Sequence, residues 1–149
     1  MAALAKEQKD FILAALAAGP RLFFTPVQVQ KLLFLADRRI PHLVGGPFFK
    51  FVPYHYGPFD KRIYPLLEEL QEEGYVSIYN DRNFRRNAYW LTETGVKVGK
   101  DRLSVLPPPA VDFLKKTADF VLKATFAQLI SAIYRAYPEM RVNSVFARQ

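Results

Sequence analysis

The residues that could carry chemistry do not form a recognisable reaction centre. His42 and His55 are the only histidines, and neither is paired with carboxylates at the spacing of a metal site. The chain has no cysteine, which excludes thiolate chemistry, disulfides and cysteine-bound zinc. No serine has a histidine near it in the sequence, and Gly45-Gly46-Pro47 does not open a helix after a strand, as a phosphate loop would. We therefore expect a protein that is not an enzyme and that holds no metal and no cofactor.

A polar loop over residues 80–87 is the strongest candidate for a contact site. In it, Arg82, Arg85 and Arg86 surround Phe84. Bound to DNA, such arginines would reach phosphates or a narrow minor groove. Bound to a protein, arginine and phenylalanine are typical interface anchors. A third interpretation is a solvated loop whose Phe84 folds back onto its own strands, and the sequence leaves all three open.

The elements that position this loop are indicated by hydrophobic periodicity and by turn residues. Two aromatic and β-branched segments on either side of the loop predict a pair of strands. Apolar residues at helical spacing predict helices before and after that pair. The expected helices cover residues 5–18, 26–40, about 60–74, 93–105, 110–123 and 126–137, and the expected strands cover 75–79 and 88–91.

Several helix starts are marked by strong local signals. Thr25 precedes Pro26 and is followed three residues later by Gln28, which predicts a capping box. The same Thr-x-x-Gln pattern recurs at Thr125, and Thr92 is expected to cap the helix after the second strand. Asp60 is the expected cap of the third helix. Pro65 then lies late for a first-turn proline, so that helix should start near Tyr64 or be kinked.

This order of elements is typical of a winged helix-turn-helix. We expect an α+β, mainly α fold in a single domain: a winged-helix-like core of three helices, a two-stranded wing and a further helix over residues 1–106, a proline turn at 107–109, and a C-terminal helical hairpin over 110–149. The stretch 41–59 is longer than a standard helix-turn-helix turn. Its aromatic residues are expected to be mainly core, and the alternative is a groove for a partner segment lined by Tyr54, Tyr56 and Phe59.

The third helix, which would be the recognition helix on DNA, favours a protein partner. At 100° per residue, its outward face carries Lys61, Pro65, Glu68, Glu69 and Glu72, flanked by Arg62 and Glu73. The start of this face is basic and the rest is strongly acidic. Four glutamates beside phosphates would be repelled. Duplex DNA is kept as the alternative partner. For either partner, the predicted contact residues are Lys61, Arg62, Arg82, Phe84, Arg85 and Arg86.

The second and third helices, with the stretch between them, carry motifs that resemble a known family. These motifs are Lys31-Leu32-Leu33 with the five residues that follow, Tyr54-His55-Tyr56-Gly57-Pro58-Phe59, Ile63-Tyr64 and Gly74-Tyr75-Val76. They resemble the SocA-like Panacea domain, and the tail from Ile133 to Ser144 is similar to the related YwgA-type proteins. The most specific element is Tyr56-Gly57-Pro58. The resemblance implies an antitoxin that neutralises a partner toxin by direct protein contact, without catalysis.

Composition and charge agree with a globular binding protein. The chain has 149 residues, of which 50% are hydrophobic, and this is the usual size of one domain. Its net charge of +7 is spread along the chain rather than gathered in a tail, and it permits an anionic partner without requiring one. The apolar run from Phe11 to Ala18 is too short to span a bilayer, and Glu7 and Asp10 interrupt the basic region that a signal peptide would need. We expect a cytoplasmic protein with no membrane partner, and its oligomeric state is left open.

Overall fold

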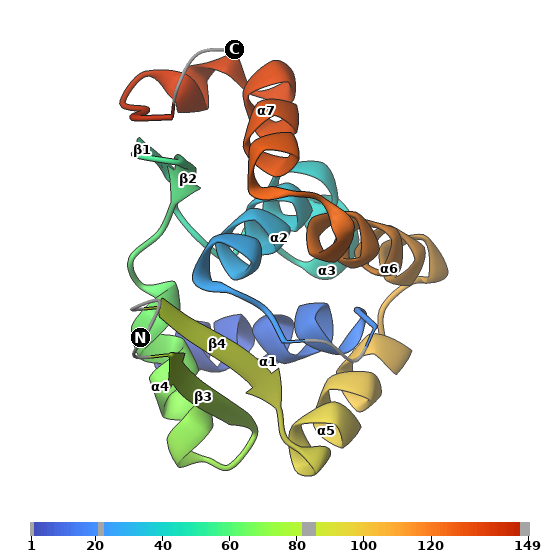
Figure 1. Cartoon of the computed structure of the whole chain (residues 1–149). Coiled ribbons are helices and arrows are strands. Elements are labelled where there is room, and N and C mark those ends of the chain that lie inside the picture. The colour runs from blue at the N-terminus through green and yellow to red at the C-terminus, as the bar shows by residue number, and fades with distance from the viewer. Residues whose placement is uncertain (1, 21–22, 82–85, 147–149) are drawn as a thin grey trace.

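The structure is a computed structural model that describes residues 2–20, 23–81 and 86–146. Its fold is α+β and mainly α, with two small antiparallel sheets of two strands each among those residues (Figure 1). The predicted fold class is therefore confirmed. Arg82, Phe84 and Arg85, three of the residues predicted to contact a partner, lie outside the described residues.

The helices and strands follow one another in the predicted order, with a short helix and an extra hairpin inserted before the third long helix. Their bounds are α1 Ala2–Ala17, α2 Pro26–Arg39, α3 Pro41–Val44, β1 Val52–Tyr54, β2 Gly57–Phe59, α4 Ile63–Glu72, β3 Val76–Asp81, β4 Arg86–Leu91, α5 Glu93–Ser104, α6 Pro108–Lys123 and α7 Phe126–Ala136, followed by a 3-10 helix over Pro138–Arg141.

The part predicted to be winged-helix-like contains α1, α2, α4, the β3–β4 hairpin and α5. Its two strands pair antiparallel from Val76 opposite Leu91 to Asp81 opposite Arg86. A third, unpredicted partner joins this wing: Phe24, in the link between α1 and α2, donates its backbone N–H to the carbonyl oxygen of Tyr89 at 3.0 Å and accepts from the Tyr89 N–H at 2.8 Å. The wing is thereby tied to the start of α2.

The predicted helix caps are mostly present. Thr25 and Thr125 each form a capping box with the glutamine three residues on, and the Thr92 side chain accepts a hydrogen bond from the Gly95 N–H. The prediction for α4 was wrong in its cap, since Arg62 rather than Asp60 stands at that position. The helix begins at Ile63, so the predicted start near Tyr64 is confirmed. Pro65 is the third residue of this helix, where a backbone N–H has no intrahelical partner to lose.

Prolines start helices here at places where the sequence suggested only breaks. Pro41 ends α2 as predicted but is itself the first residue of α3. Pro108 and Pro109 form the first turn of α6 instead of a turn between elements, because the first residues of a helix have no N–H bond to lose. The stretch 41–59, for which the sequence predicted only a long aromatic segment, forms α3 and the β1–β2 hairpin.

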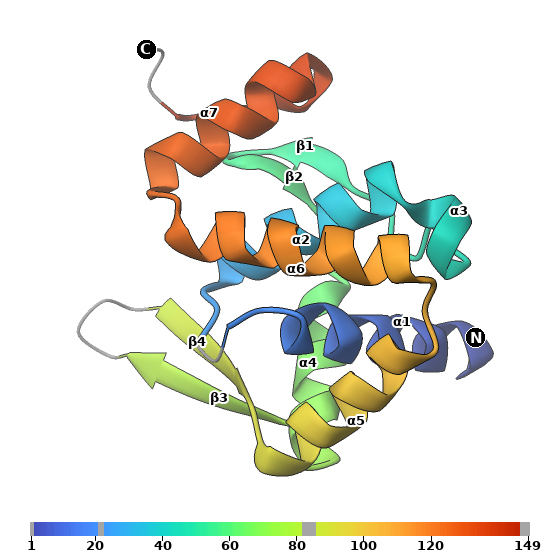
Figure 2. The same cartoon turned by 90° about the vertical axis from the view of Figure 1, so that its right-hand side faces the viewer.

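Packing brings the two ends of the chain onto one hydrophobic core. The core runs from Phe11 to Met140 and is formed mainly by α1, α2, α4, α6 and α7. Helix α5 lies along α1, and α6 lies along α2 on the other side of the molecule (Figure 2). Helix α7 packs on β2, so it lies over the inserted hairpin. None of the helices in the described part of the chain is both long and apolar enough to cross a membrane.

Candidate functional site

Four polar or charged side chains are buried in the described part of the chain, and all four bind the backbone of the segment 48–60. They are Gln8, Gln30, Lys31 and Asp37, each at most 5% exposed. Each of them donates to or accepts from a main-chain group of that segment. A buried polar group is costly unless it is paired, so these bonds hold the inserted hairpin in one position.

Asp37 and Gln8 fix the start of the segment. The two carboxylate oxygens of Asp37 accept the N–H groups of Phe48 and Phe49 at 2.7 and 2.8 Å. Burial raises the pKa of Asp37, while these two donors act in the opposite direction. Gln8 donates to the carbonyl oxygen of Phe48 at 2.7 Å and accepts from Nε of Arg62 at 3.2 Å. Helices α1 and α2 therefore share the anchoring.

Gln30 and Lys31 fix the end of the segment. The amide of Gln30 makes a reciprocal pair with the backbone of Asp60, both distances being 2.9 Å. The Lys31 Nζ donates to the carbonyl oxygen of Pro58 at 3.1 Å, and burial lowers the pKa of Lys31 to about 7. A lysine with a lowered pKa is sometimes a catalytic group, but this one is only 3% exposed and is bonded to the main chain.

The residues that carry the family resemblance meet at this point. Lys31 binds the carbonyl oxygen of Pro58, while Leu32 and Leu33 are fully buried in the core. Gly57 has a positive φ of 94°, and a Cβ on it would lie 3.3 Å from the Tyr134 ring. A glycine is needed there because other residues rarely adopt that conformation. The motif Lys31 with Tyr56-Gly57-Pro58-Phe59 therefore builds and positions the hairpin.

The hairpin presents aromatic side chains to solvent. Tyr54 is 46% exposed and Tyr56 is 42% exposed, whereas Phe49 is buried. Tyr54 stacks on His55 at 4.2 Å between ring centroids and on Phe59 at 4.8 Å. The interpretation as core holds for the first part of this stretch, around Phe49. The second part, around Tyr54 and Tyr56, forms an exposed aromatic surface.

These rings continue as far as α4. Phe59 lies 5.8 Å from the ring of Tyr64, on the first turn of that helix. We call the row His55, Tyr54, Phe59 and Tyr64 the aromatic ladder. Phe126 of α7 makes an edge contact with Tyr56 at 5.2 Å and is 44% exposed, which extends the apolar surface to a second side of the hairpin.

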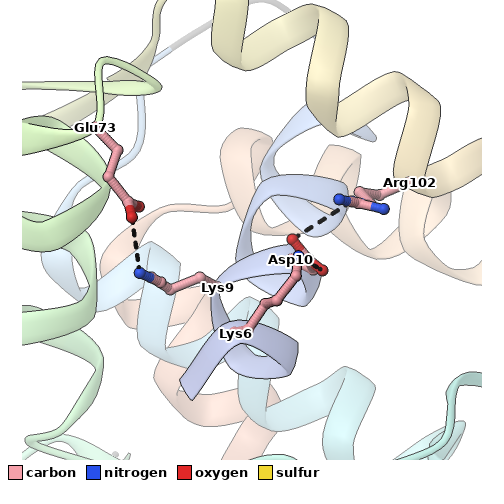
Figure 3. A network of polar contacts seen from close by, with 5 residues as sticks. All are labelled: Lys6, Lys9, Asp10, Glu73 and Arg102. Carbon is pink, nitrogen blue, oxygen red and sulfur yellow. Dashed lines mark hydrogen bonds and ion pairs between the residues drawn. The ribbon is translucent and has the colours of Figure 1, made fainter. Parts of the chain in front are cut away.

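The outer face of α4 is acidic, as its periodicity predicted. Ile63, Leu66, Leu67 and Leu70 are buried, and the four glutamates are exposed. Lys9 of α1 forms an ion pair with Glu73 at 3.0 Å (Figure 3). It also pairs with Glu69 at 3.5 Å. Among the described residues, no ion pair involves Glu68 or Glu72. Half of the acidic face is therefore neutralised at its α1 side, and the half facing the wing is not.

An open pocket of about 680 Å³ lies beside these two glutamates, between α4 and the wing. Its other lining residues are Pro26, Tyr64, Gln71, Ile78, Asn80, Asn87 and Tyr89. The walls are fixed, because Gln71 accepts the Ile78 N–H at 2.8 Å and Asn80 donates to Asn87 at 2.8 Å. Burial raises the pKa of Tyr89, and the charge of Glu68 raises it further. We call this the Glu68/Glu72 pocket.

The predicted contact residues are only partly described by the structure. Lys61 and Arg62 are exposed just before α4, and Arg62 is also bonded to Gln8. Arg86 is paired with Asp81 in the strand register. His42 and His55, the two histidines, belong to no metal-binding group among residues 2–20, 23–81 and 86–146.

Sequence reasoning missed the four buried polar anchors and the pocket. Lys31 had been grouped with its motif, but a buried lysine that binds the carbonyl oxygen of a residue 27 positions along the chain has no local signal. The pocket needs Tyr89 of β4 beside Glu68 of α4, and that pairing is set by the fold alone. Only the aromatic density of residues 48–59 pointed to the right part of the surface.

Comparisons with known proteins add no relative from which a role could be transferred. A scan with protein-family models finds no match to this chain, and no curated protein matches it either. Functional conclusions therefore depend on the geometry and on the resemblance already described.

Proposed function

We propose that this protein is a non-catalytic binding module that recognises another protein by direct contact. Its resemblance to the Panacea domain makes a toxin the favoured partner, which the module would neutralise by binding. The observation that carries the proposal is the outer face of α4, where a DNA-binding winged helix would need a surface that accepts phosphates. Glu68 and Glu72, which are exposed on that face and form no ion pair among the described residues, repel phosphates instead.

The β1–β2 hairpin gives the proposal its second support. Exposed tyrosine and phenylalanine side chains are enriched at the centres of protein interfaces. Tyr54, Tyr56 and Phe126 are each exposed by more than two fifths of their surface. The buried anchors hold the hairpin rigidly, so little conformational entropy would be lost when a partner binds it.

The position of Lys31 argues against a catalytic role. Its pKa of about 7 is that of an activated amine, but its Nζ binds the carbonyl oxygen of Pro58 inside the core. A substrate would have to displace the hairpin to reach it. The lysine therefore serves the shape of the binding surface.

Co-expression tests the proposal directly. The chain is expressed in bacteria together with each toxic protein encoded beside its gene, and growth is followed. Restored growth and a stable complex on size-exclusion chromatography are the expected results. Persistent toxicity with every neighbouring product, at confirmed expression of both proteins, would refute the proposal.

Duplex DNA is the competing partner, and one observation favours it. Lys61 and Arg62 are exposed immediately before α4. In sequence, Arg82 and Arg85 follow β3, and Arg86 begins β4. Binding through them would weaken with salt and would fall when the three loop arginines become alanine. Tight duplex binding with that behaviour, without any neutralised toxin, would replace the proposed function by a regulatory one.

A further inference from the structure

The aromatic ladder and the Glu68/Glu72 pocket meet at one residue. Tyr64 is the last ring of the aromatic ladder and also lines the Glu68/Glu72 pocket. The ladder enters from the hairpin, and the pocket opens between α4 and the wing. The two therefore form one continuous surface, which we call the ladder–pocket surface.

The chemistry of this surface is selective for positive charge. Carboxylates at Glu68 and Glu72 lie one helical turn apart, on the same face. Tyr64 lines the pocket, and the negative quadrupole on the face of a tyrosine ring attracts a guanidinium or an ammonium group. The faces of Tyr54 are covered by His55 and Phe59, so this ring offers its apolar edge to a partner. The amides of Asn80 and Asn87 add polar groups to the pocket wall.

The surrounding charges make this selectivity a local property. The chain as a whole has a net charge of +7, so an acidic surface is a departure from its average. Lys9 pairs with Glu69 and Glu73 at the other side of α4 and makes no ion pair with the pocket carboxylates. Arg62 and Lys61 are the exposed cations immediately before the start of this helix.

We propose that the ladder–pocket surface binds an arginine- or lysine-bearing segment of the protein partner, with one cationic side chain in the Glu68/Glu72 pocket and the neighbouring residues of the segment on the tyrosine rings. The inference rests on the proposed function and deepens it by naming the chemistry of the partner. It also sets the orientation of the complex, since the hairpin and α4 then face the partner together.

Peptide titration followed by NMR tests the inference on the full chain. The probe is an eight-residue peptide that alternates arginine and glycine, and its control has citrulline in place of arginine, which keeps the shape and removes the charge. The arginine peptide should shift the amide signals of Glu68, Glu72, Asn87 and the hairpin. The citrulline peptide should leave them unchanged.

Variants locate the binding. The double variant Glu68→Gln, Glu72→Gln should lose about fivefold to thirtyfold in affinity, as expected for two partly screened ion pairs. Glu93→Gln with Asp101→Asn removes two exposed carboxylates from α5 and should change the affinity less than twofold. Tyr54→Ala should weaken binding, whereas Tyr79→Ala, which removes an exposed tyrosine from the other face of the wing, should not.

Each result bears on the inference separately from the proposed function. Equal binding of the citrulline peptide, shifts on another surface, or unchanged affinity in the Glu68, Glu72 variant would overturn it. If a co-expressed toxin is neutralised equally well by that variant, the proposed function stands and the cationic segment is wrong. If the peptide behaves as expected but no toxin is neutralised, the surface stands and the proposed partner class is wrong.

Discussion

At the scale of single residues, Lys31 is a buried charged group with a structural role. Its ammonium group lies inside the core and donates one hydrogen bond to the carbonyl oxygen of Pro58. Burial lowers its pKa from the ordinary value near 10.5 to about 7, so the folded chain holds this proton less tightly than the unfolded chain does. The site therefore makes folding depend on pH.

The pH dependence gives the first prediction. Between pH 7 and about 10 the unfolded chain binds more protons at Lys31, so stability rises with pH in that window, and the stabilisation is absent below pH 7. From pH 7 to 9.5 the rise is about 3 kcal/mol. Above pH 10 it reverses, because burial raises the pKa of Tyr64 and Tyr89. Urea unfolding at several pH values measures the free energy of unfolding, and Lys31→Met should remove its rise between pH 7 and 9.5. Parallel curves for the two proteins would contradict this account.

Asp37 gives the second prediction at this scale. An asparagine there can accept only one of the two N–H groups of Phe48 and Phe49, and its own amide would face the other donor. We expect Asp37→Asn to cost about 2–3 kcal/mol in the free energy of unfolding. Asp112→Asn, at an exposed position of α6, is the matched control and should cost less than about 0.5 kcal/mol. Equal stability of the two variants would show that Asp37 does not anchor the segment.

At the scale of elements, α1 and α5 pack through a glycine. A Cβ at Gly99 would lie 2.6 Å from both the Ala17 Cβ and the Leu13 carbonyl oxygen, which is closer than packed atoms come. Gly99→Ala must therefore push the helices apart, and we expect a net loss of about 1–3 kcal/mol despite the better helix propensity of alanine. Lys97→Ala, exposed on the same helix, is the control. Denaturant unfolding measures both, and a stabilised Gly99→Ala protein would refute the close packing.

The sequence predicted those elements whose signals are local. Capping boxes at Thr25 and Thr125 and the strands on either side of the polar loop are found where they were expected. The hairpin β1–β2 was missed, because its strands have three residues each and contain Pro53 and Pro58, which weaken a strand pattern. Asp60 was taken for a helix cap, whereas its carboxylate accepts the N–H groups of Lys50 and Arg62 and closes the turn before α4.

The candidate site was predictable only in its parts. The helical period placed the glutamates on the outer face of α4 correctly. It could not show that Lys9, more than fifty residues away, neutralises two of them, nor that Tyr64 joins the hairpin to the pocket. Contacts of that kind depend on packing between distant segments, which leaves no periodic trace in the chain.

At the scale of the whole molecule, the arrangement separates two kinds of charge. The basic excess is spread along the chain, while the wing side of α4 keeps its two glutamates without an ion pair among the described residues. A molecule with net positive charge attracts nucleic acid at long range, but a duplex that docks on α4 would meet carboxylates. Weak attraction without a docking surface is therefore the expected behaviour towards DNA.

The last prediction follows from this separation. We expect the chain to bind a 20-base-pair duplex weakly and without sequence preference. The duplex should be released as the salt concentration rises from 50 to 200 mM, as expected for binding to phosphates alone. Glu68→Gln with Glu72→Gln should strengthen this binding about fivefold, because two repulsive charges beside the duplex are removed. Glu93→Gln with Asp101→Asn, which changes net charge equally on α5, should strengthen it less. Fluorescence anisotropy measures all three proteins. Sequence-selective binding that survives 200 mM salt and ignores the α4 substitutions would mean that the carboxylates do not face the duplex, and the preference for a protein partner would then fail.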